Sequence, residues 1–152
     1  MLYKSQGLVY HAEKICNAIG GEIPVPYNEQ ENTDYYDAFY KLNKKAKSGL
    51  LGKISKILNK VVFELQGITD KAVEGTWTTM KGTKITYEKW DTGEPNNANN
   101  QDYAIYWMPA NVPGWQTKIA KAWDDVSIFQ YVGIFCEINS CSTGNNFNIK
   151  KF

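Results

Sequence analysis

The chain has 152 residues, which is long enough for one domain with a substantial hydrophobic core. Its 17 lysine and arginine residues nearly balance its 16 aspartate and glutamate residues, and this balance argues against a dedicated nucleic-acid binder. No apolar run approaches the roughly 18 residues that a membrane-spanning helix requires, so we expect no transmembrane segment.

The first part of the chain is expected to contain two helices. Apolar residues at helical spacing predict a helix over residues 11–19, and Gly20-Gly21 ends it because glycine readily adopts a left-handed cap. The prolines in residues 23–26 require an extended segment. A second helix is predicted to start near Asn28 and to carry Tyr35, Tyr36, Phe39, Tyr40 and Leu42.

A lysine-rich stretch without acidic residues covers residues 41–60. Leucine and isoleucine recur at helical spacing in its second half, which predicts a basic amphipathic helix. Such a helix can face a membrane or a polyanion, or it can pack on the domain with a solvated lysine face. We favour the packed interpretation, because a polar helix face is usually only a solvated one.

The rest of the chain is predicted to form short strands around a long loop. Residues 91–101 are rich in asparagine, glycine and proline, which predicts a surface loop, and residues 109–120 have no regular pattern. Two helices followed by short strands define an α+β fold class. The expected strands cover residues 61–65, 102–107 and 129–138, and a hairpin is expected from residues 75–78 and 84–87 on either side of Lys81-Gly82.

Two separated clusters of oxygen-bearing side chains lie on turn-like sequence. The first is the Glu-Pro-Asn-Asn run at residues 94–97, and the second is the Trp-Asp-Asp run at residues 123–125. Gln101 and Asp102 lie near the first run. Calcium takes six to eight oxygen ligands from carboxylates, amides and carbonyls. We therefore expect these two acidic turns to hold one calcium ion jointly.

With these elements in order, the chain resembles a C-type lectin-like domain over nearly its full length. An ordered set of motifs carries the resemblance, although each motif alone is weak. It implies a double-loop α+β fold with two helices, small antiparallel sheets and a long loop that carries calcium and sugar, similar in style to the short forms in collectins and mannose receptors. The motifs are Cys16 with Gly20-Gly21, residues 26–32, Gly67-Ile68-Thr69-Asp70, Glu74-Gly75-Thr76-Trp77, Trp90, Gly93-Glu94-Pro95-Asn96-Asn97, Trp123-Asp124-Asp125 and Cys136-Glu137.

Three cysteines allow one intrachain bridge and leave one thiol over. The residues alone permit a bridge from Cys16 to either distal cysteine, or three reduced thiols. The resemblance implies a disulfide between Cys16 and Cys136, so we expect a secreted protein whose signal peptide would precede this sequence. The resemblance also places Tyr103 and Ile128 where the family has its second disulfide. Cys141 is outside the family pattern and is a candidate for joining two copies of the chain.

The resemblance implies two calcium sites and a cis peptide bond between Glu94 and Pro95. The family's mannose-type pattern has glutamate where this chain has Gln101, and asparagine where it has Asp124. The two changes offset each other in charge, so we expect calcium binding to survive. A one-residue slip in the loop would give Asp102 the role assigned to Gln101. The implied ligands are Glu94, Asn96, Gln101, Asp124 and Asp125 in the principal site, and Asp70, Glu74, Asn97 and Asp102 in a weaker second site.

The exchange of acid and amide at Gln101 and Asp124 also affects which sugar we expect the site to prefer. The resemblance implies that two neighbouring hydroxyls coordinate calcium and that each bonds one acid, which only accepts hydrogen bonds, and one amide, which donates. In the mannose-type pattern an approximate twofold axis relates the two acid–amide pairs. Exchanging acid and amide at Gln101 and Asp124 breaks that symmetry, so we favour a galactose-type preference over mannose or fucose. Trp107 and Trp115 are candidates for stacking on the sugar. The implied sugar-binding residues are Glu94, Asn96, Gln101 and Asp124.

Enzyme interpretations fail on the residues present. A single histidine, His11, and three scattered cysteines do not supply a zinc site or a catalytic triad, and the sequence has no glycine-rich phosphate loop. We expect a glycan-binding domain over residues 1–141, with the insertion at residues 41–60, and a polar tail over residues 142–152. The main alternative is a lectin-like module that binds protein without calcium.

Overall fold

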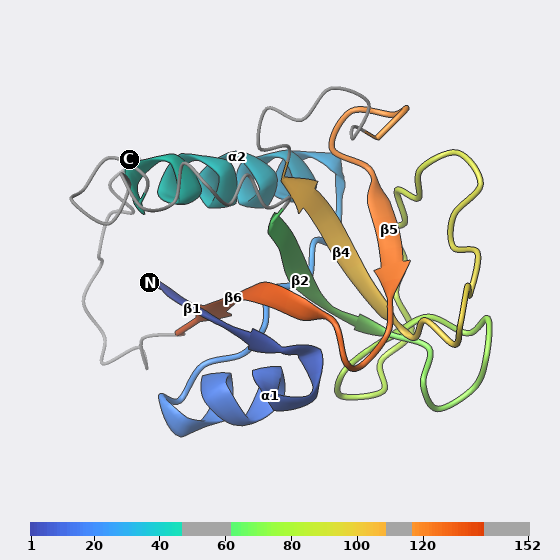
Figure 1. Cartoon of the computed structure of the whole chain (residues 1–152), viewed down its shortest axis with the longest axis horizontal. Coiled ribbons are helices and arrows are strands. Elements are labelled where there is room, and N and C mark those ends of the chain that lie inside the picture. The colour runs from blue at the N-terminus through green and yellow to red at the C-terminus, as the bar shows by residue number, and fades with distance from the viewer. Residues whose placement is uncertain (47–61, 109–116, 139–152) are drawn as a thin grey trace.

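The structure is a computed structural model that describes residues 1–46, 62–108 and 117–138. Within these residues, two helices lie on opposite faces of one mixed β-sheet (Figure 1). The elements in chain order are β1 (Leu2–Leu8), α1 (Val9–Ala18), α2 (Glu29–Ala46), β2 (Val62–Thr69), β3 (Thr78–Thr79), β4 (Tyr103–Met108), β5 (Trp123–Val126) and β6 (Tyr131–Glu137).

The sheet has the strand order β1-β6-β2-β4-β5, and the short β3 pairs with β2. Neighbouring strands are antiparallel except β2 and β6, which meet in parallel. β1 pairs along its whole length with β6, from Leu2 opposite Glu137 to Leu8 opposite Tyr131. The first and last described strands therefore lie side by side, and β5 forms the other edge of the sheet.

The second helix starts at the predicted position. The side-chain oxygen of Asn28 accepts the Glu31 N–H at 2.9 Å, and the Glu31 carboxylate accepts the Tyr27 N–H at 2.8 Å. These contacts satisfy backbone donors that the start of a helix leaves without partners. The helix continues to Ala46, and the rest of the predicted basic helix at residues 41–60 lies outside the described residues. No described helix combines the length and the apolar character needed to cross a membrane.

Apolar side chains form two clusters, one on each side of the sheet. On the α1 side, Ala12 and Cys16 pack in one cluster with Ile134. On the α2 side, Phe39 stacks on Phe135 with ring centroids 4.0 Å apart. Ile134 and Phe135 are neighbours on β6, and because side chains alternate along a strand, one enters each cluster.

The structure contains the disulfide that the resemblance implies, between Cys16 of α1 and Cys136 of β6, with an S–S distance of 2.00 Å. Tyr103 and Ile128 belong to the hydrophobic cluster on the same side of the sheet. Both also line a cavity of about 690 Å³ beside α1. Apolar packing at the border of a cavity thus occupies the positions where the resemblance places a second disulfide. Cys141 and the tail at residues 142–152 lie outside the described residues.

Most of the predicted elements are present, and the α+β class is confirmed, with three differences in detail. β1 is a strand that the sequence analysis did not predict. The acidic run at residues 123–125 is part of strand β5 and not a turn, because its backbone pairs with β4. The expected hairpin is reduced to β3, which pairs with β2 and keeps one bridge, from Thr78 to Lys84. The loop at residues 91–101 contains no helix and no regular strand, as predicted.

Candidate metal centre

The loop at residues 91–101 is attached to the edge strand β5. Trp123 donates its N–H to the Lys89 carbonyl at 2.7 Å, and the Trp123 carbonyl accepts the Asp91 N–H at 2.9 Å. The Asp91 carboxylate accepts the N–H groups of residues 118–119 at 3.0 and 2.8 Å. Burial raises the pKa of Asp91, but these backbone donors outweigh burial and lower it below its usual value. The loop is therefore tied to the segment that leads into β5.

Asparagine residues shape the loop itself. Asn97, Asn99 and Asn100 have φ values of 48°, 61° and 61°. Asparagine tolerates this left-handed conformation better than most residues do. The side-chain oxygen of Asn97 also accepts the Gln101 N–H at 2.8 Å, which closes the turn. The peptide bond at residues 94–95 is cis, as the resemblance implies.

Three carboxylates meet where the loop lies against β5. Glu94 from the loop and Asp124 and Asp125 from the strand bring one oxygen each within 4.8 Å of one another. No other group of His, Cys, Asp or Glu side chains converges this closely in the described part of the chain. The buried Asp125 carboxylate accepts the N–H groups of Asn96 and Asn97 at 3.2 and 2.8 Å. These two bonds hold the loop backbone against the strand.

The carboxylates change each other's protonation. Burial, the charge of Asp124 and contacts with Asp125 raise the pKa of Glu94 to about 7. Burial also raises the pKa of Asp124, although N–H donors to its carboxylate oppose the shift. Carboxylates this close repel one another unless protons or a cation compensate their charge. The cluster is therefore electrostatically suited to a cation.

Two oxygen atoms of predicted ligands have no donor. Among the described residues, no hydrogen-bond donor reaches the buried Glu94 Oε2 or the buried Gln101 Oε1. A buried oxygen left in this way costs about 1–3 kcal/mol unless something else binds it. Carboxylate and amide oxygens are the ligands that calcium prefers. The donor set therefore fits a calcium ion.

Asn96 lies beside the three carboxylates. Its backbone N–H donates to Asp125 at 3.2 Å, and its side-chain oxygen accepts the Ala98 N–H at 2.8 Å. An amide oxygen has two lone pairs, so one remains after this bond. Asn96 is thus placed to contribute an oxygen ligand while it also shapes the loop.

A second acidic group lies between the end of β2 and the start of β4. The buried Asp70 carboxylate accepts a backbone N–H at 2.9 Å through Oδ2, and its Oδ1 has no donor among the described residues. Burial and the charges of Asp70 and Asp102 raise the pKa of Glu74, whereas a contact with Asn97 lowers it. Burial and Asp70 also raise the pKa of Asp102. Asp102 thus lies with this second group, which favours the register that assigns Gln101 to the first.

The sequence analysis missed the contact between Trp107 and Asp124. Trp107 on β4 donates its Nε1–H to Asp124 Oδ2 at 2.5 Å. Ile105 is directly opposite Asp124 in the ladder, so Trp107 is the diagonal neighbour of Asp124 on the same face of the sheet. This strand register is the signal that would have identified the contact, and the order of residues alone does not reveal it.

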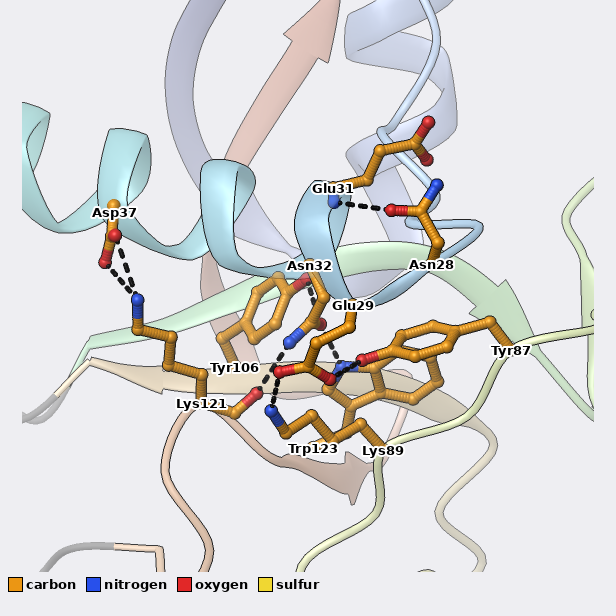
Figure 2. Close-up of polar contacts among 10 residues, drawn as sticks. All are labelled: Asn28, Glu29, Glu31, Asn32, Asp37, Tyr87, Lys89, Tyr106, Lys121 and Trp123. Carbon is orange, nitrogen blue, oxygen red and sulfur yellow. Dashed lines mark hydrogen bonds and ion pairs between the residues drawn. The ribbon is translucent and has the colours of Figure 1, made fainter.

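Figure 2 shows a second contact that the sequence analysis missed, at the fully buried Asn32 of α2. Its Oδ1 accepts the Tyr106 hydroxyl at 2.8 Å and the Trp123 Nε1–H at 2.7 Å. Its Nδ2 donates to the Lys121 carbonyl at 3.1 Å. These bonds attach the helix to Trp123, which directly precedes Asp124.

Similarity to known proteins was found at the level of both sequence and structure, although no family model matches the chain. A perlucin-like protein from Mytilus galloprovincialis is 28% identical over 72% of this chain and 62% of its own length. Mannose-binding protein from Gallus gallus is 29% identical over 61% of this chain and 29% of its own length. The chain thus spans less than two thirds of the length of these relatives.

Solved structures with the same fold cover most of the chain. The carbohydrate-recognition domain of mouse scavenger receptor C-type lectin has a TM-score of 0.62 at 16% identity, and the match covers 92% of this chain and 89% of that one. C-type lectin CEL-I from Cucumaria echinata has a TM-score of 0.62 at 18% identity, with 89% and 85% covered. A calcium-independent type II antifreeze protein has a TM-score of 0.61 at 17% identity, with 89% and 82% covered. The relatives and the solved structures agree with one another, and the chain has the fold of a C-type lectin-like domain.

Proposed function

We propose that this domain binds carbohydrate through a calcium ion held by Glu94, Asp124 and Asp125, with Asn96 and Gln101 as further ligands. The proposal rests on the convergence of the three carboxylates within 4.8 Å. The buried oxygens of Glu94 and Gln101, which have no donor in the described part of the chain, support it. The carbohydrate-recognition domains among the structural neighbours support a glycan as the class of ligand. When bound, calcium supplies coordination positions for two neighbouring sugar hydroxyls.

The residues of the cluster have different tasks in this proposal. The buried Asp125 binds the loop backbone and fixes the position of the ligands. Glu94 and Asp124 accept hydrogen bonds from sugar hydroxyls, and the amides of Asn96 and Gln101 donate to them. With three carboxylates facing one divalent ion, we expect calcium affinity in the range of about 10⁻⁴–10⁻³ M that is typical of extracellular modules.

We propose a galactose-type preference within this function. The exchange of acid and amide at Gln101 and Asp124 leaves Glu94 and Asn96 in the mannose-type arrangement, so the two halves of the site no longer match by a twofold axis. A sugar whose neighbouring hydroxyls are not equivalent suits such a site better than one with two equatorial hydroxyls. Mannose or fucose is the alternative ligand.

The calcium part of the proposal is tested by calorimetry. The wild-type protein is expected to bind calcium, and Glu94→Gln is expected to weaken binding at least about tenfold because it removes one of three charged ligands. Asp34→Asn is the matched control, because it removes one exposed acid of α2 that is remote in sequence from both ligand segments. A wild-type protein that binds no calcium at millimolar concentration would contradict the proposal.

The sugar part is tested by retention on galactose-agarose and mannose-agarose, with and without a chelator. Retention on galactose that the chelator abolishes is the expected result. Retention on mannose alone would contradict the galactose preference but not the lectin function. Passage through both columns regardless of chelator would contradict carbohydrate binding and favour a protein-binding module.

We further propose a weaker calcium site at the second acidic group, and an extracellular location that the disulfide supports. We propose binding and not catalysis, in line with the lectin names of the structural neighbours. One lectin domain binds a monosaccharide weakly, so useful avidity requires several linked sites. A homo-oligomer, possible through Cys141, would provide them.

A further inference from the structure

The contact between Trp107 and Asp124 joins two adjacent strands at the candidate metal centre. The indole Nε1–H of Trp107 donates to Asp124 Oδ2 at 2.5 Å. The other oxygen, Oδ1, accepts the Asp125 N–H at 2.8 Å. The Asp124 carboxylate is therefore held by two donors, one from its own strand and one from β4. Hydrogen bonds to a charged carboxylate favour its ionised form and restrict its orientation.

Trp107 is itself held in place. Its ring packs edge to face on Phe63, the residue opposite it on β2, with centroids 5.1 Å apart at 86°. The backbone carbonyl of Trp107 accepts the Tyr36 hydroxyl of α2 at 3.3 Å. The indole ring thus packs against the neighbouring strand, and the helix holds the Trp107 backbone. Such support is what a residue needs in order to position a metal ligand.

Asp124 is also the position where this chain departs from the mannose-type pattern, which has asparagine there. An asparagine has one oxygen, so the indole N–H and the metal would have to share that single atom. An aspartate has two oxygens with two lone pairs each, so it can accept the indole N–H with Oδ2 and the Asp125 N–H with Oδ1, and the second lone pair of Oδ1 can still face a cation. The tryptophan donor and the aspartate therefore fit each other as a pair.

We propose that Trp107 is a positioning residue that orients the Asp124 carboxylate as a calcium ligand, and that aspartate is preferred to asparagine at position 124 because Trp107 binds one of its two oxygens. This inference rests on the proposed calcium site and assigns a partner to one of its ligands. Trp107 does not touch the ion, and it acts only through Asp124.

A double-mutant cycle followed by calcium calorimetry tests the inference. Trp107→Phe keeps a ring on Phe63 but removes the donor, and it is expected to weaken calcium binding about 10- to 100-fold, as loss of such outer partners does. In the Asp124→Asn background the same change is expected to have no effect or to strengthen binding, since the single oxygen is released toward the metal. Equal losses in both backgrounds would overturn the inference.

A measurement on calcium-free protein gives an independent readout and also shows whether each variant is folded. In nuclear magnetic resonance spectra of the wild-type protein, the indole N–H signal missing from Trp107→Phe belongs to Trp107. Asp124→Asn is expected to shift that signal strongly, with small shifts for the other four of the five tryptophans. No shift would overturn the inference. A wild type that binds no calcium overturns the proposed function and this inference with it, whereas calcium binding unaffected by Trp107→Phe overturns the inference alone.

Discussion

Glu94 is the residue on which burial and neighbouring charges act most clearly in the candidate site. Burial, the charge of Asp124 and contacts with Asp125 raise its pKa to about 7. In calcium-free protein near neutral pH, a proton therefore occupies Glu94 in part of the molecules. A metal ion must displace that proton before it binds. We infer that acidification and calcium act on the same oxygen atoms.

In the presence of a chelator, stability is expected to fall as the pH rises from about 5 to about 8. The pKa of Glu94 rises from 4.5 to about 7, so the folded protein binds this proton more tightly than the unfolded chain does. The resulting stabilisation is complete below 4.5 and is lost as the pH rises through 7. The raised pKa of Asp124 acts in the same direction. Thermal unfolding across this pH range measures the effect.

The matched variants for this experiment are Glu94→Gln and Glu88→Gln. The first variant removes the titratable carboxyl at position 94, so its melting temperature is expected to depend less on pH than that of the wild type. The second removes an exposed acid and is expected to keep the wild-type dependence. A wild-type slope in Glu94→Gln would mean that other groups cause the pH dependence.

At the scale of elements, α2 holds β5 through buried polar contacts as well as apolar packing. The side chain of Asn32 binds Tyr106, Trp123 and the Lys121 backbone, and all of its polar atoms have partners (Figure 2). A fully satisfied buried group of this kind specifies one arrangement of the elements around it. Here it sets where β5 begins, and therefore where its two aspartates lie.

Asn32→Ala is expected to destabilise the domain by about 2–4 kcal/mol, because it leaves the buried Tyr106 hydroxyl and Trp123 N–H without their acceptor. Urea unfolding measures the change. Asp37→Asn is the control, since it breaks the ion pair of Asp37 with Lys121, whose side chains are 59% and 28% exposed. That pair also joins α2 to the segment before β5, and its loss is expected to cost less than about 1 kcal/mol. Equal losses would contradict the assigned role of Asn32.

Local patterns predicted the helices well and the edge strands poorly. The helix start at Asn28 depends on neighbouring residues, and these are readable in sequence. β5 was interpreted as a turn because its acidic residues are typical of turns, yet its pairing with β4 decides its conformation. The three carboxylates that converge at the candidate metal centre were predictable from the motif order, because each motif is a short run. Trp107 was not, because its contact with Asp124 depends on strand register.

At the scale of the whole molecule, two connections join segments that are distant in the chain. The disulfide links Cys16 and Cys136, 120 residues apart, and in the chain-entropy model such a loop contributes about 4–5 kcal/mol. The candidate metal centre links Glu94 to the edge strand β5. Tyr103 and Ile128 stand where the resemblance places a second disulfide, so no disulfide joins β4 to the segment after β5 in the described structure. We infer that the long loop depends on the ion more than it would with a second disulfide between positions 103 and 128.

Calcium is therefore expected to stabilise the entire fold and not only the loop. Because the ligands come from two segments that separate on unfolding, the unfolded chain binds the ion poorly, and a hundredfold excess over the dissociation constant stabilises the folded state by about 2.7 kcal/mol. Urea unfolding at increasing calcium concentration measures this gain. Glu94→Gln is expected to lose most of it, and magnesium is expected to substitute poorly because it keeps its own water ligands. A stability that does not change with calcium would mean that the three carboxylates are compensated by protons alone.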